Sequence, residues 1–159
     1  MRSTATALFI VCSAVSAGAQ QVTATLNANL PPVARLSLST STIVFPDADP
    51  DTVPLVASSP PTIAITAKAR AVAGSTITLT MEAADDLRSG LDTISVSTIT
   101  WTATGPGFAS GTLRRAPQVV ATWSGSGVRN GDQSFLFANK WSYPTGTYTA
   151  TILYTLAAP

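Results

Sequence analysis

Histidine is absent from the 159-residue chain, and Cys12 is its only cysteine. These absences remove the commonest general base, the usual zinc ligands and the nucleophile pairs that combine serine or cysteine with histidine. Charged residues make up 11% of the chain, against ~25% in ordinary globular proteins. Nine basic residues face eight acidic ones, for a net charge of +1, so no strong field attracts a polyanion. The composition predicts no nucleic-acid partner.

Motifs of covalent catalysis are also missing. The chain contains neither Gly-x-Ser-x-Gly nor Ser-x-x-Lys, the usual settings of a nucleophilic serine. No spacing of acidic residues places two carboxylates across a cleft, as glycoside hydrolysis requires. We therefore expect a protein that is not an enzyme and that holds no cofactor.

The first 19 residues have the pattern of a secretory signal peptide. A positive start at Arg2 precedes a short apolar stretch, and Ala17-Gly18-Ala19 provides small residues at the positions that signal peptidase reads. The apolar stretch is shorter than the ~20 residues of a membrane span. We expect cleavage after Ala19 and a mature chain from Gln20 with no cysteine and no membrane span. The expected location is extracellular or on the cell surface, with periplasmic transit where an outer membrane exists.

Apolar and polar residues alternate with period two along most of the mature chain, and Thr, Val and Ile dominate these rows. The rows cover residues 22–30, 63–70, 76–83, 93–104, 119–123, 135–137 and 147–156. Turn signals separate them, among them Asn130-Gly131-Asp132. A change of phase near Ser97-Thr98 predicts a β-bulge. The pattern predicts an all-β fold, an antiparallel immunoglobulin-like β-sandwich of about nine strands over residues 31–159.

Aromatic residues divide into two groups. Those that share parity with apolar neighbours are expected in the core: Trp101, Trp123, Tyr148 and Tyr154. Trp141 and Tyr143 flank a turn instead. They are the candidates for an exposed contact with a glycan.

Three acidic residues alternate in one loop, at Asp47, Asp49 and Asp51. Carboxylates at this spacing resemble the start of a calcium loop, but an EF-hand would need Gly at position 52 and Glu at position 58, which are Thr52 and Ser58. The alternative is an Asp/Pro-rich turn whose side chains cap their own backbone. The turn is favoured, with calcium as the one candidate ion.

The N-terminal segment of the mature chain, residues 20–30, carries alternate apolar residues before a break at Pro31-Pro32. These residues are Val22, Ala24, Leu26, Ala28 and Leu30. Such a segment can complete the open sheet edge of a neighbouring subunit, with backbone hydrogen bonds and side chains in alternate pockets. It can equally form the first strand of its own sandwich. Both alternatives stay open at this point.

The C-terminal strand carries a resemblance to bacterial chaperone–usher pilins, including the spore coat U type. It reads from Gly146 through Thr147-Tyr148 into an alternating strand with Ile152, Tyr154 and Leu156. The resembling pilins close with Gly, Thr-Tyr and an alternating strand that ends in an aromatic. Here five more residues follow Tyr154. The resemblance implies a surface subunit whose final strand is handled by a chaperone and an usher.

The same strand is similar to the distal motif of WxL cell-wall-binding domains, Tyr-x-x-x-Leu/Ile/Val-Thr-Trp-x-Leu. Tyr148, Ile152 and Leu156 match it, whereas Leu153 and Tyr154 replace its Thr and Trp. The Trp-x-Leu motif that names the family is absent. This resemblance implies a monomeric module that binds cell-wall glycan.

Two functions of different classes follow. The first is a structural subunit of a bacterial surface fibre or coat, whose partners are copies of itself or related subunits. The second is a cell-wall or glycan-binding surface module. Export, a single sandwich domain and the lack of a catalytic set favour the structural subunit.

Overall fold

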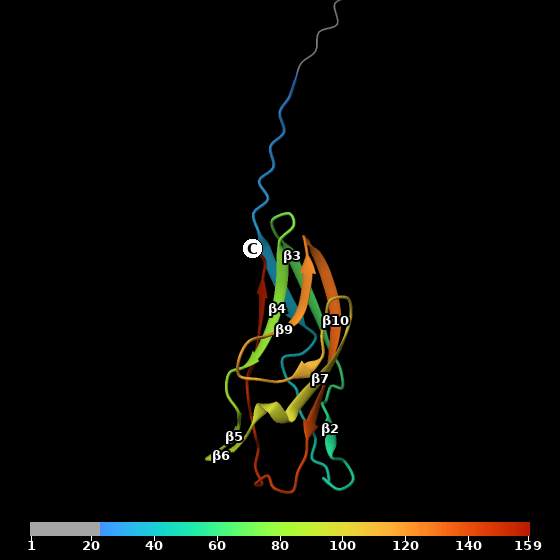
Figure 1. Cartoon of the computed structure of the whole chain (residues 1–159), viewed down its shortest axis with the longest axis vertical. Coiled ribbons are helices and arrows are strands. Elements are labelled where there is room, and N and C mark those ends of the chain that lie inside the picture. Colours follow the sequence, from blue (N-terminus) through green and yellow to red (C-terminus); the bar gives the residue numbers. More distant parts are fainter. Residues whose placement is uncertain (1–22) are drawn as a thin grey trace, which may run out of the picture.

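The computed structural model describes residues 23–159 (Figure 1). The expected signal peptide, Cys12 and Val22 lie outside the described residues. The described part contains eleven β-strands, one 3-10 turn and no α-helix, and its strand ladders are all antiparallel. The expected all-β antiparallel fold is confirmed. Within these residues no helix has the length and apolarity needed to cross a bilayer.

The larger sheet has the order β1-β3-β10-β7-β8, with β2 paired to β10. Its strands are β1 (Val33–Leu38), β2 (Leu55–Ala57), β3 (Ile63–Arg70), β7 (Ile99–Thr104), β8 (Gly111–Thr112) and β10 (Gly127–Ala138). Alternate side chains of each strand point to opposite faces of the sheet, and in β3 the inward ones are buried: Ile63, Ile65, Ala67 and Ala69.

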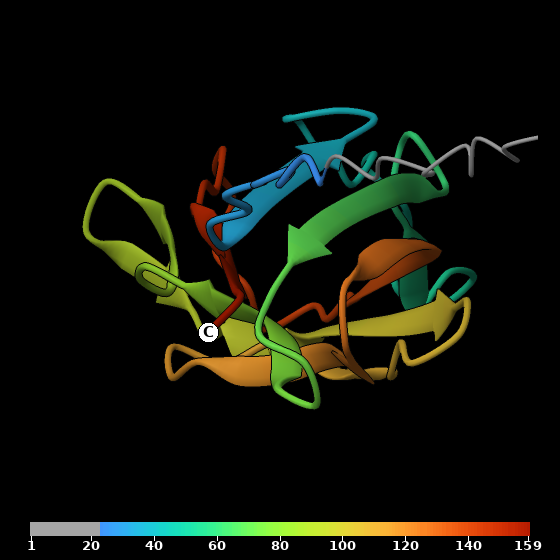
Figure 2. The same cartoon turned by 90° about the horizontal axis from the view of Figure 1, so that it is seen from above.

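The smaller sheet has the order β11-β4-β9. Its strands are β4 (Thr76–Ala83), β9 (Gln118–Ser124) and β11 (Ile152–Ala157), and a separate hairpin joins β5 (Leu87–Ser89) to β6 (Asp92–Ile94). The two sheets enclose one core, in which Ile77, Leu79 and Met81 of β4 are fully buried. Seen from above, β1 and β11 lie beside each other at the edges of the two sheets (Figure 2).

The expected bulge near Ser97-Thr98 was wrong. A 3-10 turn, η1 (Val96–Thr98), separates β6 from β7 there and produces the change of phase. The irregular pairing lies between β4 and β9, where the register shifts after Leu79. In consequence Val120 is buried and Val119 is 52% exposed, although simple alternation would place Val119 on the same face as the buried Ala121 and Trp123.

The expected turn at Asn130-Gly131-Asp132 was also wrong, because β10 runs straight through these residues. The ring of Phe108 occupies the space beside Gly131, where an added Cβ would come within 2.5 Å of it. The glycine therefore serves close packing within a strand.

Candidate functional site: an open groove between the two sheets

A groove of about 750 Å³ opens between the edge of the larger sheet and the edge of the smaller one. One wall is formed by Leu38 and residues 40–48, and the other by residues 146–152 with Tyr154. Core side chains form its floor: Val56, Ile63, Leu87, Ile99, Leu113 and Phe135. The groove thus reaches the hydrophobic core from one side of the sandwich.

Both strands that border this side have one unpaired edge. β1 forms a ladder only with β3, and β11 only with β4. In the described part of the chain no ladder joins β1 to β11, although they are neighbours. Unpaired strand edges present rows of free N–H and C=O groups, which makes them templates for another strand.

The last strand, expected over residues 147–156, is shorter in the structure because β11 begins at Ile152, and the inward side chains of residues 148–156 are half-buried instead of fully buried. Tyr148, Ile152, Tyr154 and Leu156 pack against the core but keep part of their surface exposed. Their expected inward parity agrees with the structure. Trp101 and Trp123, expected in the core with the two tyrosines, are buried at 3% and 7% exposure. The inward side chains near the C-terminus therefore leave this side of the core partly uncovered.

The wall formed by residues 146–152 is held in place by the β5–β6 hairpin. Arg88 and Thr149 exchange two backbone hydrogen bonds of 3.0 Å. Arg88 also donates from Nε to Asp85 at 2.6 Å, and this bond is the first cause that lowers the pKa of Asp85. Asp86 accepts a hydrogen bond from the backbone N–H of Val96. These contacts fix the extended course of the chain after Gly146.

A polar contact crosses the core at Tyr154, the last residue of the 146–154 wall of the groove. The hydroxyl of Tyr154 donates to Oε1 of Gln133, which is fully buried in β10, at 2.6 Å. Burial raises the pKa of Tyr154 far above its ordinary value. Nε2 of Gln133 has no hydrogen-bond partner among the described residues. The contact ties the edge strand β11 to the centre of the opposite sheet.

The N-terminal segment leaves the sandwich at the end opposite the 46–54 loop (Figure 1). Its described part, residues 23–30, belongs to neither sheet and is exposed, with Leu26 at 96% and Leu30 at 67%. Nε of Arg70 donates to the carbonyl oxygen of Pro31 at 2.8 Å, which fixes the base of the segment. The described part thus forms no first strand of its own sandwich in this structure.

The Pro31-Pro32 break bears on where this segment is able to pair. A two-residue hairpin turn of type I′ or II′ needs a positive φ at its first central residue. Proline is restricted to a φ near −65°. Residues 23–30 are therefore barred from folding back on β1 through a tight turn. Their alternating apolar face remains available to another chain.

The acidic loop forms the turn that the sequence favours over calcium. The side chain of Asp49 accepts a hydrogen bond from the N–H of Asp51 at 2.9 Å, and its carbonyl accepts from Val53 at 2.8 Å. Oδ1 of Asp51 accepts from Nε1 of Trp141 at 3.0 Å. Within residues 23–159 no three acidic or cysteine side chains are gathered in a way that would hold a metal ion.

The two candidate glycan contacts differ in exposure. Trp141 is 69% exposed, as expected. Tyr143 is half-buried, because its ring packs on Phe137 with centroids 5.8 Å apart, and Phe137 in turn packs on Phe45. The pair does not form one exposed aromatic platform, and the expectation of an exposed Tyr143 was wrong.

Two parts of the groove were missed by the sequence analysis. Ile43 and Phe45 alternate in the sequence as they would in an ordinary strand, yet the chain from 40 to 48 forms a wall of the groove without a ladder of its own. Gln133 was not singled out, although it stands at an inward parity between Gly131 and Phe135. A polar residue at an inward position of a strand was the available signal.

Comparison of the chain with known protein families, with curated proteins and with solved structures finds no match.

Proposed function

We propose that the protein is a non-enzymatic structural subunit of a bacterial cell-surface fibre or coat, assembled by donor-strand exchange. Residues 20–30 of one copy fill the groove of the next copy. The observation that carries this proposal is the groove itself, which is open to the core and is lined in part by Leu38 of β1 and by Ile152 and Tyr154 of β11, two strands that each have an unpaired edge. An interface of this kind is head-to-tail and propagates into a fibre unless rotation closes it into a ring.

The donor segment and the groove agree in length and in chemistry. An extended strand rises about 3.3 Å per residue, so residues 20–30 and the wall from 146 to 154 each span roughly 30–35 Å. The apolar side chains of the segment fall on one face, which suits the apolar floor of the groove. The polar side chains of Thr23, Thr25, Asn27 and Asn29 fall on the other face.

The test places the same charge on either face of the donor segment. Leu26→Arg directs a guanidinium into the groove floor, and we expect the mature protein to lose its polymers in sedimentation and electron microscopy. Asn27→Arg is the matched control, because its side chain points away from the floor, and it should leave the polymers intact. A peptide of residues 20–30 should raise the Tm of the Leu26→Arg protein, whereas the peptide carrying Leu26→Arg should not.

If the mature protein is a cooperative monomer at high concentration and both variants behave like it, donor-strand exchange is wrong. If the 20–30 peptide does not bind to the Leu26→Arg protein, the groove does not accept a donor strand.

A cell-wall glycan-binding module is the second candidate. Its support is the exposed indole of Trp141, which offers a flat face for a sugar ring. Trp141→Ala should then abolish binding of the purified protein to cell walls, with Val72→Ala, an exposed apolar residue at the opposite end, as the control. Equal binding by wild type and Trp141→Ala would remove this candidate.

A further inference from the structure

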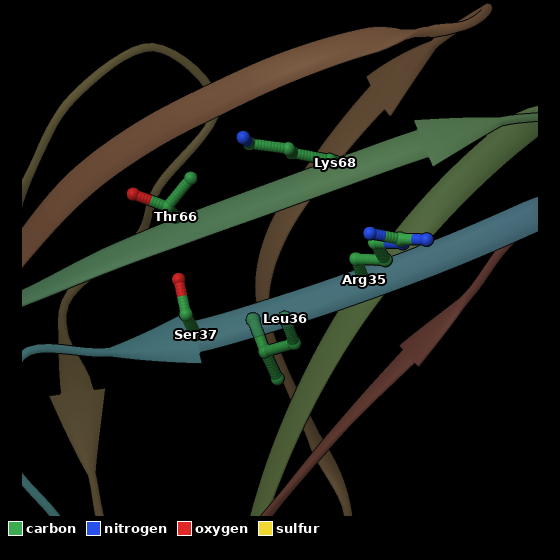
Figure 3. Close-up of a pocket in the computed structure, with 5 residues that line it drawn as sticks. All are labelled: Arg35, Leu36, Ser37, Thr66 and Lys68. Carbon is green, nitrogen blue, oxygen red and sulfur yellow. The ribbon is translucent and has the colours of Figure 1, made fainter.

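Basic side chains gather on the outer face of β1 and β3, at the end where the donor segment leaves. Arg35 lies directly opposite Lys68, and Ser37 opposite Thr66, in the ladder of the two strands. They line a shallow pocket of about 250 Å³, and the two cationic side chains lie on the same side of the sheet (Figure 3). Arg70 follows in the same row, opposite Val33.

This arrangement is unfavourable in an isolated subunit. Like charges directly opposite each other across two strands destabilise a sheet. No acidic residue of the described chain compensates them, since the ion pairs within residues 23–159 involve only Arg88 and Arg115 with Asp85 and Asp86. The three cations are thus available to an external anion.

The matching anions lie at the other end of the molecule. Asp47, Asp49 and Asp51 are exposed, and none of them takes part in an ion pair of the described chain. Their loop is fixed to the end of the sandwich, because Nδ2 of Asn139 donates to the carbonyl of Ala48 at 2.8 Å. Asp47 itself lines the groove. The acidic loop therefore lies at the end of the groove that Asp47 lines.

The direction of the donor strand decides which charges meet. β11 runs from the acidic end toward the end where the N-terminal segment leaves (Figure 1). A donor that pairs with the free edge of β11 in the antiparallel sense, the sense of every ladder among residues 23–159, runs parallel to β1 and brings Leu30 to the end of the groove where Asp47 lies. The donor subunit's Arg70, which holds Pro31, and its neighbours Arg35 and Lys68 then approach the acceptor's acidic loop. A parallel donor would bring two basic ends together.

We propose that the cluster Arg35, Lys68 and Arg70 of one copy docks on the Asp47–Asp51 loop of the next copy, and that this ionic contact sets the polarity of the assembled fibre. The inference rests on the proposed donor-strand assembly. The ionic contact contributes to the rate and direction of association. Complementary charges raise association rates by about 10–10³-fold, and salt weakens this effect because it screens the charges.

The first experiment reverses charges that make no hydrogen bond within the described subunit. Asp47→Lys alone and the pair Arg35→Glu with Lys68→Glu should each slow assembly of the mature protein at low salt by about tenfold or more, with a weaker dependence on salt. The combination of all three changes should restore much of the rate. Arg114→Glu, a reversal of an exposed cation outside the cluster, is the control and should change the rate little.

A second measurement reads polarity directly. Asp47→Cys combined with Lys68→Cys in one chain should yield disulfide-linked ladders on oxidation of the fibres, whereas each single change should yield none. Dimers from Lys68→Cys alone would overturn the inference, because the basic ends would then face each other. Unchanged rates in every reversal variant would overturn it as well.

Failure of this inference is distinguishable from failure of donor-strand assembly. If the 20–30 peptide stabilises the Leu26→Arg protein but charge reversal leaves assembly unchanged, only the ionic junction is wrong. If the peptide has no effect and no polymers form, the donor strand and the junction fail together.

Discussion

The two long sides of the sandwich are closed in different ways. On the side of β7 and β9, the connecting chain crosses between the sheets with backbone hydrogen bonds from Leu113 to Ile99 and from Ala109 to Val120, both 2.9 Å long. The indole of Trp101 adds a hydrogen bond to the carbonyl of Ala109 at 2.8 Å. On the side of β1 and β11, no ladder of the described residues joins the two edge strands.

The difference does not come from hydrophobicity. Leu156 of β11 stands directly opposite Leu79 of β4 in the same sheet. Leu79 is fully buried between two neighbours, while Leu156 at the open edge is half-buried. Equal side chains are thus covered unequally because one strand lacks a partner. A long apolar edge is a hazard for aggregation unless a specific strand covers it.

The largest expected effect comes from the closed part of the core. Leu79→Ala removes a fully buried side chain and should lower the free energy of unfolding by about 2–5 kcal/mol, measured by urea denaturation. Thr80→Ala, its neighbour on the other face of β4, is the control and should cost much less. Similar losses at both positions would mean that the faces of β4 are misassigned.

Leu156→Ala tests the open edge and should cost only about 1–2 kcal/mol in the isolated subunit, because the side chain is half-exposed before the change. Ile152→Ala, at a position of β11 that lines the groove, should cost more when the 20–30 peptide fills the groove, whereas the cost of Leu79→Ala should stay constant. The measurement is chemical denaturation with and without peptide. A loss at Leu156 as large as that at Leu79 would contradict an open edge.

Tyr154→Phe tests the contact between the open edge and the opposite sheet. It leaves Oε1 of Gln133 without its donor and should cost about 1–2 kcal/mol. The raised pKa of Tyr154 also sets a pH dependence. The unfolded tyrosine loses its proton at about 10 and the folded one at a higher pH, so stability falls as the pH rises above about 10. The variant should lose less stability over this range, and parallel pH profiles would contradict this coupling.

Sequence reasoning was most successful where local alternation determines the result. The buried faces of β3 and β4 follow from period two alone, because a half-buried strand must place its apolar residues on one side. The acidic loop was likewise read as a self-capping turn, since Asp49 forms its hydrogen bond with Asp51, two residues along the chain. Both features depend on neighbours that are close in sequence.

Sequence reasoning failed where a distant segment decides. Gly131 was read as part of a turn, but Phe108 from another part of the chain fills the space beside it and keeps β10 continuous. Val119 and Val120 are indistinguishable by residue type, and only the register shift against β4 determines which of them is buried.

The amino-acid sequence by itself determined that this protein is all-β and that a segment with alternating apolar residues precedes Pro31-Pro32, because alternation is a local property. Only the tertiary structure decided that β1 and β11 border an open groove, since an unpaired edge is defined by a partner that is absent from the sheet. It also decided that the cations of β1 and β3 and the carboxylates of residues 47–51 stand at opposite ends. Residues that are distant in sequence come to lie at the same end of the molecule only when the strands that carry them pair in a fixed register.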